Sequence, residues 1–247
     1  MIRFIEDPNL PEGRVVKAIC GEIPYEAEKL LIDRGIELLS CSENKLIDPS
    51  VSTHADMCAL HLGGDIIVVD KAQNELIAQL KKHNFSVIET TEKIAGEYPS
   101  DIKLNVALFS GNAVGAFRYT ESAVLDNITD YKKFDVKQGY SKCSILPIND
   151  NALITDDTSI YNALKNAFNV LLVEKGDITL VGHGYGFIGG ASAKISKDEI
   201  FFFGDIRNHR SYKEISEFLF LHNCKAVYPE NVPLTDVGGM VTLCEYI

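Results

Sequence analysis

The stretch GYSKCSILPINDNALITD, which runs from Gly139 to Asp156, contains the pattern from which the architecture can be predicted. An apolar run from Cys143 to Ile148 is followed by Asn149-Asp150-Asn151 and by a second apolar run from Ala152 to Thr155. Asn and Asp tolerate the positive φ that tight hairpin turns require. The stretch therefore predicts a β-hairpin.

The same pattern recurs along the chain. Further hairpins are predicted over His54–Val69, Ile102–Phe117 and Ala191–Phe203. Each predicted hairpin is followed by a segment with apolar residues at helical spacing and then by another strand-like run. The hairpins begin at intervals of roughly 40 to 48 residues, a period typical of propeller blades.

The ends of the chain predict how the repeat closes. A first unit has the strand Val15–Ile19 before its helix, and the final run Gly239–Cys244 supplies a strand that can pair beside it. The sequence therefore predicts an α/β fold, a five-bladed propeller of strand-strand-helix-strand repeats closed by the C-terminal strand. We expect one domain over residues 1–247, with residues 1–14 as an irregular arm. The predicted helices are Glu26–Arg34, Gln73–His83, Ser122–Ile128, Ser159–Ala167 and Tyr212–His222.

Composition excludes several classes of function. The net charge of −11 over 247 residues argues against nucleic acid as a partner, because phosphate binding needs a basic surface. No apolar run reaches the roughly 18 residues of a membrane helix, and the N-terminus lacks the features of a secretion signal. The six cysteines show no paired spacing, which is typical of free thiols in the reducing cytoplasm.

Several motifs resemble a known superfamily. They are Thr53-His54-Ala55-Asp56-Met57, Tyr98-Pro99-Ser100-Asp101-Ile102 with Asn105, Gly139-Tyr140-Ser141-Lys142-Cys143-Ser144, Gly186-Phe187-Ile188-Gly189-Gly190-Ala191-Ser192 and Asp236-Val237-Gly238-Gly239. The chain resembles the guanidine-modifying enzymes of the pentein superfamily. From about residue 50 onward it is more closely similar to an uncharacterised family of clostridial-type bacterial proteins within that superfamily.

The resemblance implies a chemistry. Superfamily enzymes such as arginine deiminase, dimethylarginine hydrolase and agmatine deiminase use a nucleophilic Cys against a guanidinium carbon, a His that moves protons, and acidic residues that hold the cation. Their Cys follows a glycine-rich turn and a His on the final strand. Here that stretch is Gly238-Gly239-Met240-Val241-Thr242-Leu243-Cys244, without a His and with Cys244 one residue late. Tyr140 stands where the resemblance implies the catalytic His.

In this fold the starts of the hairpin strands converge on a central axis, where we expect the site. Cys143 or Cys244 is predicted as the nucleophile and His54 as the base. Asp56, Asp101 and Asp236 are predicted to anchor a cation. The remaining predicted binding residues are Asn105, Tyr140, Lys142, Ser192 and Asp205.

Other interpretations compete at several of these positions. His54, Asp56 and Cys58 alternate along a predicted strand and could face a metal ion, although three ligands on one short strand rarely converge, so we predict no metal. The ammonium group of Lys142 would lower the pKa of the neighbouring Cys143, but adjacent strand residues face opposite sides, so we expect one of the two to line the channel.

The segment Gly184-Tyr185-Gly186-Phe187-Ile188-Gly189 matches a dinucleotide fingerprint by letter. A hairpin rather than a helix follows it, so we expect no cofactor there or elsewhere. We predict instead that Gly182–Gly190 forms a flexible, lid-like loop that brings His183 to the channel mouth. Asp156-Asp157 is predicted to be the charged N-terminus of the following helix.

Two hypotheses of function follow. In the first, the protein is a hydrolase or transferase that acts on a C–N bond of a small guanidino or amino metabolite. In the second, it is a non-catalytic binding protein for a small ligand or a macromolecule, which the missing His-Cys signature favours. The expected partner is a small molecule in the central channel, and the oligomeric state is not predicted.

Overall fold

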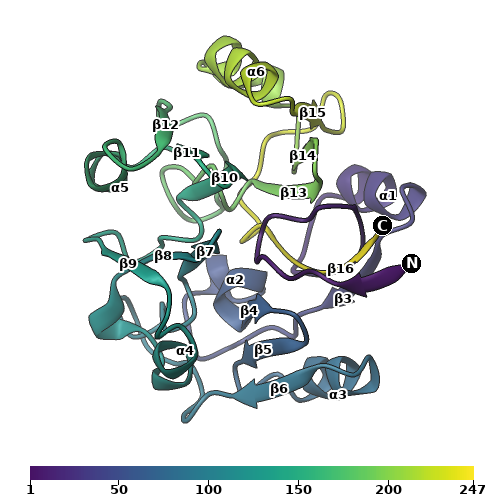
Figure 1. Ribbon diagram of the computed structural model, residues 1–247, viewed down its shortest axis with the longest axis vertical. Helices are drawn as coiled ribbons and strands as arrows, with labels where there is room; N and C mark the ends of the chain where they lie inside the picture. Colours follow the sequence, from purple (N-terminus) through teal and green to yellow (C-terminus); the bar gives the residue numbers. More distant parts are fainter.

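In the computed structural model, which describes residues 1–247, the strands form five small sheets arranged around a centre (Figure 1). Four of the sheets contain three strands each, in the order of the chain. Their strands are β4 (Ala59–Gly63), β5 (Ile66–Val69) and β6 (Ser86–Glu89); β7 (Ala107–Phe109), β8 (Asn112–Gly115) and β9 (Lys132–Asp135); β10 (Ile145–Asn149), β11 (Ala152–Thr155) and β12 (Asn169–Leu172); and β13 (Ser192–Ser196), β14 (Glu199–Phe202) and β15 (Lys225–Val227).

The first sheet joins the two ends of the chain. It consists of β1 (Ile2–Phe4), β16 (Met240–Tyr246), β2 (Arg14–Cys20) and β3 (Glu37–Ser40), in that order. The predicted pairing of the last strand beside Val15–Ile19 is confirmed, because β16 runs antiparallel to β2. The prediction of an irregular arm over residues 1–14 is wrong for β1, whose backbone pairs with the outer edge of β16.

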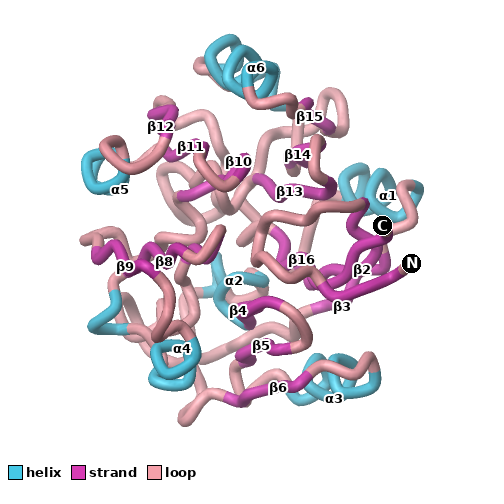
Figure 2. The backbone as a smooth tube through the Cα atoms, in the orientation of Figure 1, coloured by secondary structure: helices cyan, strands magenta, loops and turns pink.

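The five units share one local plan. In the four three-stranded sheets the first two strands are an antiparallel hairpin and the third strand runs parallel to the second, with a helix between them. These connecting helices lie at the periphery, whereas the short α2 lies near the centre (Figures 1 and 2). The helices are α1 (Tyr25–Asp33), α2 (Ala55–Cys58), α3 (Asn74–Lys82), α4 (Ser122–Asn127), α5 (Thr158–Leu164) and α6 (Tyr212–Leu221), with 3-10 turns η1 (Pro49–Val51), η2 (Phe117–Tyr119) and η3 (Ile206–Asn208).

The continuous apolar runs of the hairpins reflect burial on both faces. Along β14, Ile200 and Phe202 pack against the β10–β12 sheet, while Phe201 and the following Phe203 pack against the first sheet. Side chains alternate between the two faces of a strand, so neither face of this strand reaches water. Five such core clusters occur, each between consecutive sheets, and one of them lies between the β13–β15 sheet and the first sheet.

The predicted hairpins begin too early in three units. Residues 54–58, 102–106 and 143–144 were predicted as strand, yet β4, β7 and β10 begin later, at Ala59, Ala107 and Ile145. In their place the chain makes helical turns, in which Met57 N–H donates to the His54 carbonyl at 3.1 Å and Ser144 N–H donates to the Tyr140 carbonyl at 3.0 Å. These buried turns are apolar like the strands that follow them, so periodicity does not separate the two.

None of the helices has the length and apolar character that crossing a bilayer requires.

Candidate functional site

The turns that precede the first strands bring their polar side chains together at the centre. Asp56 lies on α2, Asn105 lies in the turn before β7, and Cys143 lies in the turn before β10. The Cys143 thiol donates a hydrogen bond to Asp56 Oδ2 at 2.7 Å. Asn105 Nδ2 donates to Cys143 Sγ at 3.3 Å, so three separate units meet at this sulfur.

Asn105 also fixes the backbone that carries the thiol. Its Oδ1 accepts hydrogen bonds from the backbone N–H groups of Lys142 at 2.8 Å and Cys143 at 3.3 Å. Lys142 is also buried, and it lines a separate small cavity together with Asp56 and Leu60. Cys143 therefore lines the pocket described below, and Lys142 does not, although the reason is the helical turn rather than strand alternation.

A fourth unit contributes Asp236 through a glycine-rich loop. Asp236 Oδ2 accepts a hydrogen bond from Phe187 N–H at 2.8 Å, and Oδ1 accepts one from Gly238 N–H at 3.0 Å. A side chain at Gly190 would place its Cβ 2.0 Å from Asp236 Oδ1, and one at Gly186 would place it 2.4 Å from the Asp236 Cβ. These glycines are required because the carboxylate packs directly on their backbone.

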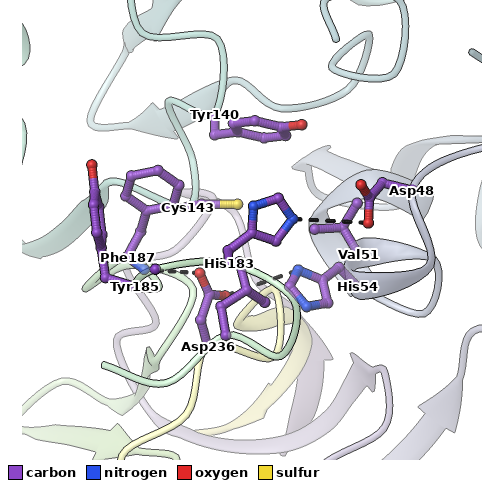
Figure 3. Close-up of a pocket in the computed structure, with 11 residues that line it drawn as sticks. Asp48, Val51, His54, Tyr140, Cys143, His183, Tyr185, Phe187 and Asp236 are labelled. Carbon is purple, nitrogen blue, oxygen red and sulfur yellow. Dashed lines mark hydrogen bonds and ion pairs between the residues drawn. The ribbon is translucent and has the colours of Figure 1, made fainter. Parts of the chain in front are cut away.

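A pocket of about 230 Å³ opens above the Cys143 thiol (Figure 3). The aromatic rings of Tyr140 and Phe187 lie on two sides of it, with centroids 6.2 Å apart. We call this cavity the inner pocket. It is lined by Asp48, Val51, His54, Tyr140, Cys143, Leu180, His183, Gly184, Tyr185, Phe187 and Asp236.

Four buried oxygen and nitrogen atoms in this part of the protein have no hydrogen-bond partner. His54 Nδ1, Asp56 Oδ1, Asp101 Oδ1 and Asp156 Oδ1 are all buried and make no hydrogen bond. An unpaired buried polar group costs roughly 1 to 3 kcal/mol, so native proteins retain such groups rarely. Of these atoms only His54 Nδ1 belongs to a residue that lines the inner pocket, where it can accept a hydrogen bond from a ligand N–H.

The electrostatics of the site also favour a cation. Burial raises the pKa of Asp236 to about 7, and the nearby charge of Asp56 adds to this effect. Burial raises the pKa of Asp56 to about 6, although Lys142 acts in the opposite direction. Burial and the charges of Asp56 and Asp236 raise the pKa of the Cys143 thiol well above its usual range. A bound cation would lower all three pKa values.

His54 stands between Asp236 and the pocket mouth. Its Nδ1 lies 3.9 Å from Asp236 Oδ1, and burial lowers its pKa to about 4. The imidazole is therefore neutral at pH 7, with a ring nitrogen able to accept a hydrogen bond. Cys58, four residues further along the chain from His54, accepts a hydrogen bond from Gln73 Nε2 at 3.4 Å and does not line the inner pocket.

Asp101 and Ser192, which were predicted to bind the ligand, instead support residues around the inner pocket. Tyr140 OH donates to Asp101 Oδ2 at 2.8 Å, so Asp101 orients the tyrosine ring rather than lining the pocket. Ser192 Oγ donates to the Ile188 carbonyl at 2.6 Å and ties the glycine-rich loop to β13.

Cys244 and Asp205 lie away from the site. Cys244 is packed in the apolar cluster between the first sheet and α3, beside Leu39 and Val69. The pairing of β16 with β2 shifts register at a bulge between Thr242 and Cys244. Burial raises the pKa of the Cys244 thiol. Asp205 forms two hydrogen bonds with the Arg207 guanidinium, at 2.8 and 2.9 Å, which hold the pKa of Asp205 below its usual range.

The predicted lid is shorter than Gly182–Gly190. Gly189 and Gly190 are buried, and a Cβ at Gly189 would lie within 2.7 Å of three carbonyl oxygens of the turn that carries Cys143. Residues 181–185 are exposed and cross the pocket mouth. There His183 Nε2 lies 2.8 Å from Ser50 Oγ and 3.8 Å from Asp48 Oδ1.

Asp48, Phe187 and Asp156 were missed by the sequence analysis. Asp48 and Phe187 lie in loops, where no periodicity marks a side chain as facing a pocket. Asp157 caps α5 as predicted, since its Oδ1 accepts from Ser159 N–H and Ile160 N–H. Its neighbour Asp156 instead points inward and accepts a hydrogen bond from Ile188 N–H at 2.9 Å. Nothing in the sequence distinguishes the aspartate that caps the helix from the adjacent one that is buried.

Comparison with known protein families gives one match for this chain. A family model described as "Family of unknown function (DUF6873)" matches residues 18–241. Comparison with curated protein sequences gives no match.

Several solved structures share the fold. An amidinotransferase of the saxitoxin biosynthetic pathway from Microseira wollei has a TM-score of 0.60 at 7% identity, over 95% of this chain and 97% of its own. Inosamine-phosphate amidinotransferase from Streptomyces griseus has a TM-score of 0.57 at 10% identity, over 95% of both chains. Agmatine deiminase from C. jejuni has a TM-score of 0.52 at 12% identity, over 93% of this chain and 94% of its own. At such low identity the similarity establishes the fold alone, which this chain shares with these amidinotransferases and this deiminase.

Proposed function

The chain belongs to the family of unknown function DUF6873, and we propose that its inner pocket binds the guanidinium or amidinium group of a small metabolite and that Cys143 attacks the central carbon of that group. One observation carries the proposal. The Cys143 thiol lines a pocket whose wall includes the buried carboxylate of Asp236, and it donates a hydrogen bond to the buried carboxylate of Asp56 at 2.7 Å.

The carboxylates supply the binding energy. Each oxygen of Asp236 accepts one backbone N–H and keeps a second lone pair for a ligand. A planar cation with several N–H groups matches this arrangement because charge-assisted hydrogen bonds to carboxylates are strong and directional. The rings of Tyr140 and Phe187 add apolar and cation–π contacts to its faces.

Binding of the cation activates the thiol. In the free protein the thiol is protonated, and a positive charge beside it favours the thiolate. Sγ then forms a bond to the guanidinium carbon while the thiol proton passes to Asp56. The C–N bond breaks, and the departing nitrogen takes up a proton and leaves as an amine or ammonia.

A second step regenerates the enzyme. Attack by water on the thio-linked carbon would release a ureido product, and attack by an amine would transfer the amidino group. In both cases the C–S bond breaks and Sγ recovers a proton. His54 is placed to accept a hydrogen bond from the attacking water or amine, because its imidazole is neutral.

The fold supports this proposal. The similar structures are named as amidinotransferases and an agmatine deiminase, and a further one is DDAH from Pseudomonas aeruginosa in complex with citrulline. The apolar clusters that link each sheet to two neighbours support the finer expectation of a closed pentein propeller. On this reading the site lies at one end of the propeller axis.

A second candidate function is ligand binding without turnover. It is favoured by the raised pKa of Cys143, which makes the free thiol a poor nucleophile. In that case the same carboxylates hold the cation and the thiol acts as a hydrogen-bond donor to Asp56.

Matched alkylating reagents test the proposal. Cationic 2-chloroacetamidine and neutral 2-chloroacetamide are each added at pH 7.5, and modified cysteines are identified by mass spectrometry. We expect the amidine to label Cys143 faster than the amide, and a guanidino compound to protect Cys143. Equal rates with the two reagents, without protection, would overturn the proposal. Release of ammonia or a ureido product, abolished in Cys143→Ser, then separates catalysis from binding.

A further inference from the structure

A second cavity lies beside the inner pocket, at the outer side of the loop that crosses its mouth. It has a volume of about 700 Å³. It shares Asp48, His54, Leu180 and Asp236 with the inner pocket. We call it the outer groove. Its lining is Glu22, Ile23, Pro24, Asp48, Pro49, Ser50, Thr53, His54, Leu180, Val181, Gly182, Thr235, Asp236 and Val237.

The contact of His183 with Ser50 separates the two cavities. Ser50 Oγ donates to Asp48 Oδ1 at 2.6 Å, so its hydroxyl oxygen accepts from His183 Nε2–H at 2.8 Å. The side chains of His183 and Asp48 are 47% and 50% exposed, and a hydrogen bond at this exposure contributes little stability. A ligand that displaces this contact can therefore extend from one cavity into the other at a small cost in free energy.

His54 links the two cavities chemically. Its side chain is 5% exposed, it lines both cavities, and its Nδ1 has no hydrogen-bond partner. An unsatisfied buried nitrogen at the junction indicates that a polar group of a ligand passes here. The inner pocket and the outer groove are thus two parts of one site.

The charges of this combined site have one sign. Its acidic side chains are Glu22, Asp48 and Asp236, and neither lining contains a Lys or Arg. Outside the lining, Lys175 stands over the Tyr185 and Phe187 rings at 5.3 and 5.7 Å and is paired with Asp157 at 3.5 Å. A carboxylate or phosphate on the ligand would meet no cationic partner and would face like charges.

We propose that the ligand is a dication without an anionic group, with its guanidinium in the inner pocket and an ammonium in the outer groove near Asp48 and Glu22. This inference rests on the proposed function and specifies its substrate class as guanidinoalkylamines rather than guanidino acids. A guanidino amino acid carries the same cationic head, yet its carboxylate would lie in the acidic groove.

Three compounds with related chains test the inference by calorimetry at pH 8, on the intact protein and on Cys143→Ser, which prevents turnover. They are 4-guanidinobutylamine, butylguanidine and arginine. We expect 4-guanidinobutylamine to bind about three- to fivefold more tightly than butylguanidine, because its ammonium group adds one partly exposed ion pair. Arginine should bind at least about tenfold more weakly than 4-guanidinobutylamine, because its carboxylate is unpaired.

Matched variants locate the second subsite. Glu22→Gln should remove much of the preference for 4-guanidinobutylamine over butylguanidine and leave the affinity for butylguanidine unchanged. Glu75→Gln on α3 removes one surface charge elsewhere and should change neither affinity. Arginine binding as tightly as 4-guanidinobutylamine, or a preference that survives both Glu22→Gln and Asp48→Asn, would overturn this inference while leaving the proposed function intact. Failure of all three compounds to bind would overturn the proposed function itself.

Discussion

The thiol of Cys143 donates its hydrogen bond to a carboxylate, Asp56, rather than to a histidine or a lysine. A carboxylate beside a thiol opposes formation of the thiolate, because the two negative charges repel each other. Lys142 is the nearest cation in the sequence, yet it lines a separate small cavity with Asp56 and lowers the pKa of that carboxylate. The arrangement keeps the sulfur neutral until a cation arrives.

The Asp56 carboxylate both accepts the hydrogen bond from Cys143 and supplies a negative charge beside it, and Asp56→Asn separates these two roles. Asn can still accept the hydrogen bond from Cys143, but it no longer opposes the thiolate or attracts a cation. We expect neutral 2-chloroacetamide to label Cys143 up to about tenfold faster at pH 8, since removal of the neighbouring negative charge lowers the thiol pKa. We expect 2-chloroacetamidine to lose its advantage over the amide. The measurement is the rate of each reaction between pH 6 and 9.

Asp101→Asn is the matched control for this experiment. Asp101 is a buried carboxylate that contacts Tyr140 and not the thiol. Its replacement should leave the ratio of the two labelling rates close to that of the intact protein. A change of both rates in the same direction in Asp56→Asn would instead indicate a general loosening of the site.

Binding of a guanidinium compound should weaken as the pH falls. The pKa of Asp236 is raised to about 7 and that of Asp56 to about 6, so both carboxyls take up protons between pH 8 and pH 5.5. A cation pairs with the ionised form, and we expect the affinity for butylguanidine to fall at least about tenfold over this range. Calorimetry in several buffers would also show the release of protons on binding near pH 6.5.

Asp236→Asn should flatten this pH dependence as well as weaken binding, because the group with the higher pKa is gone. An affinity for butylguanidine that stays constant from pH 5.5 to 8 would contradict the assignment of these carboxylates to the cation.

The repeating hairpins were predictable from sequence, and the turns that build the site were not. In the central hairpin, the apolar runs on each side of Asn149-Asp150-Asn151 are specified locally by turn chemistry and alternation. The turn at Cys143 is specified by Asn105, which lies 38 residues earlier and accepts two of its backbone N–H groups. Such a contact has no trace in the local pattern. The resemblance implies a site that includes Asp56 and Asp236, but it could not show that Cys244 is buried in a bulged strand.

Asp156 and Asp157 are neighbours whose pKa values are shifted in opposite directions. We therefore expect replacement by Asn to have opposite effects on stability at the two positions. Burial, and then the charges of Asp236 and Asp157, raises the pKa of Asp156 to about 7. The folded protein therefore binds a proton that the unfolded chain has released above its ordinary pKa near 4. This difference reduces stability progressively between about pH 4 and pH 7. Asp156→Asn should increase the free energy of unfolding by about 1 to 3 kcal/mol at pH 8 and change it little at pH 4.5.

Asp157→Asn provides the contrast. Hydrogen bonds from Ser159 and Ile160 outweigh burial and lower the pKa of Asp157, so its charge stabilises the folded state above the ordinary pKa and this contribution disappears in acid. The substitution should reduce stability at pH 8. Urea unfolding at pH 4.5 and pH 8 measures both variants. A loss of stability at pH 8 in Asp156→Asn would show that its ionised carboxylate is better satisfied than its contacts indicate.

Gly190→Ala should displace the Asp236 carboxylate, because the substitution adds a single Cβ atom against it. The added Cβ would lie 2.0 Å from Asp236 Oδ1, and the neighbouring backbone cannot yield because Gly190 N–H donates to the Cys143 carbonyl at 2.7 Å. Asp236 must then leave its hydrogen bonds with Phe187 and Gly238. We expect a loss of about 2 kcal/mol or more in stability, as for other steric intrusions into packed interiors, and loss of butylguanidine binding.

Gly184→Ala tests whether this effect is local. Gly184 also lines the inner pocket, but an added Cβ would meet no atom within 4 Å. This variant should unfold at the same urea concentration as the intact protein and should bind butylguanidine with unchanged affinity. Equal damage from the two substitutions would mean that the loop as a whole, rather than the contact between Gly190 and Asp236, governs the site. Damage from Gly190→Ala alone would locate the requirement at the Asp236 carboxylate.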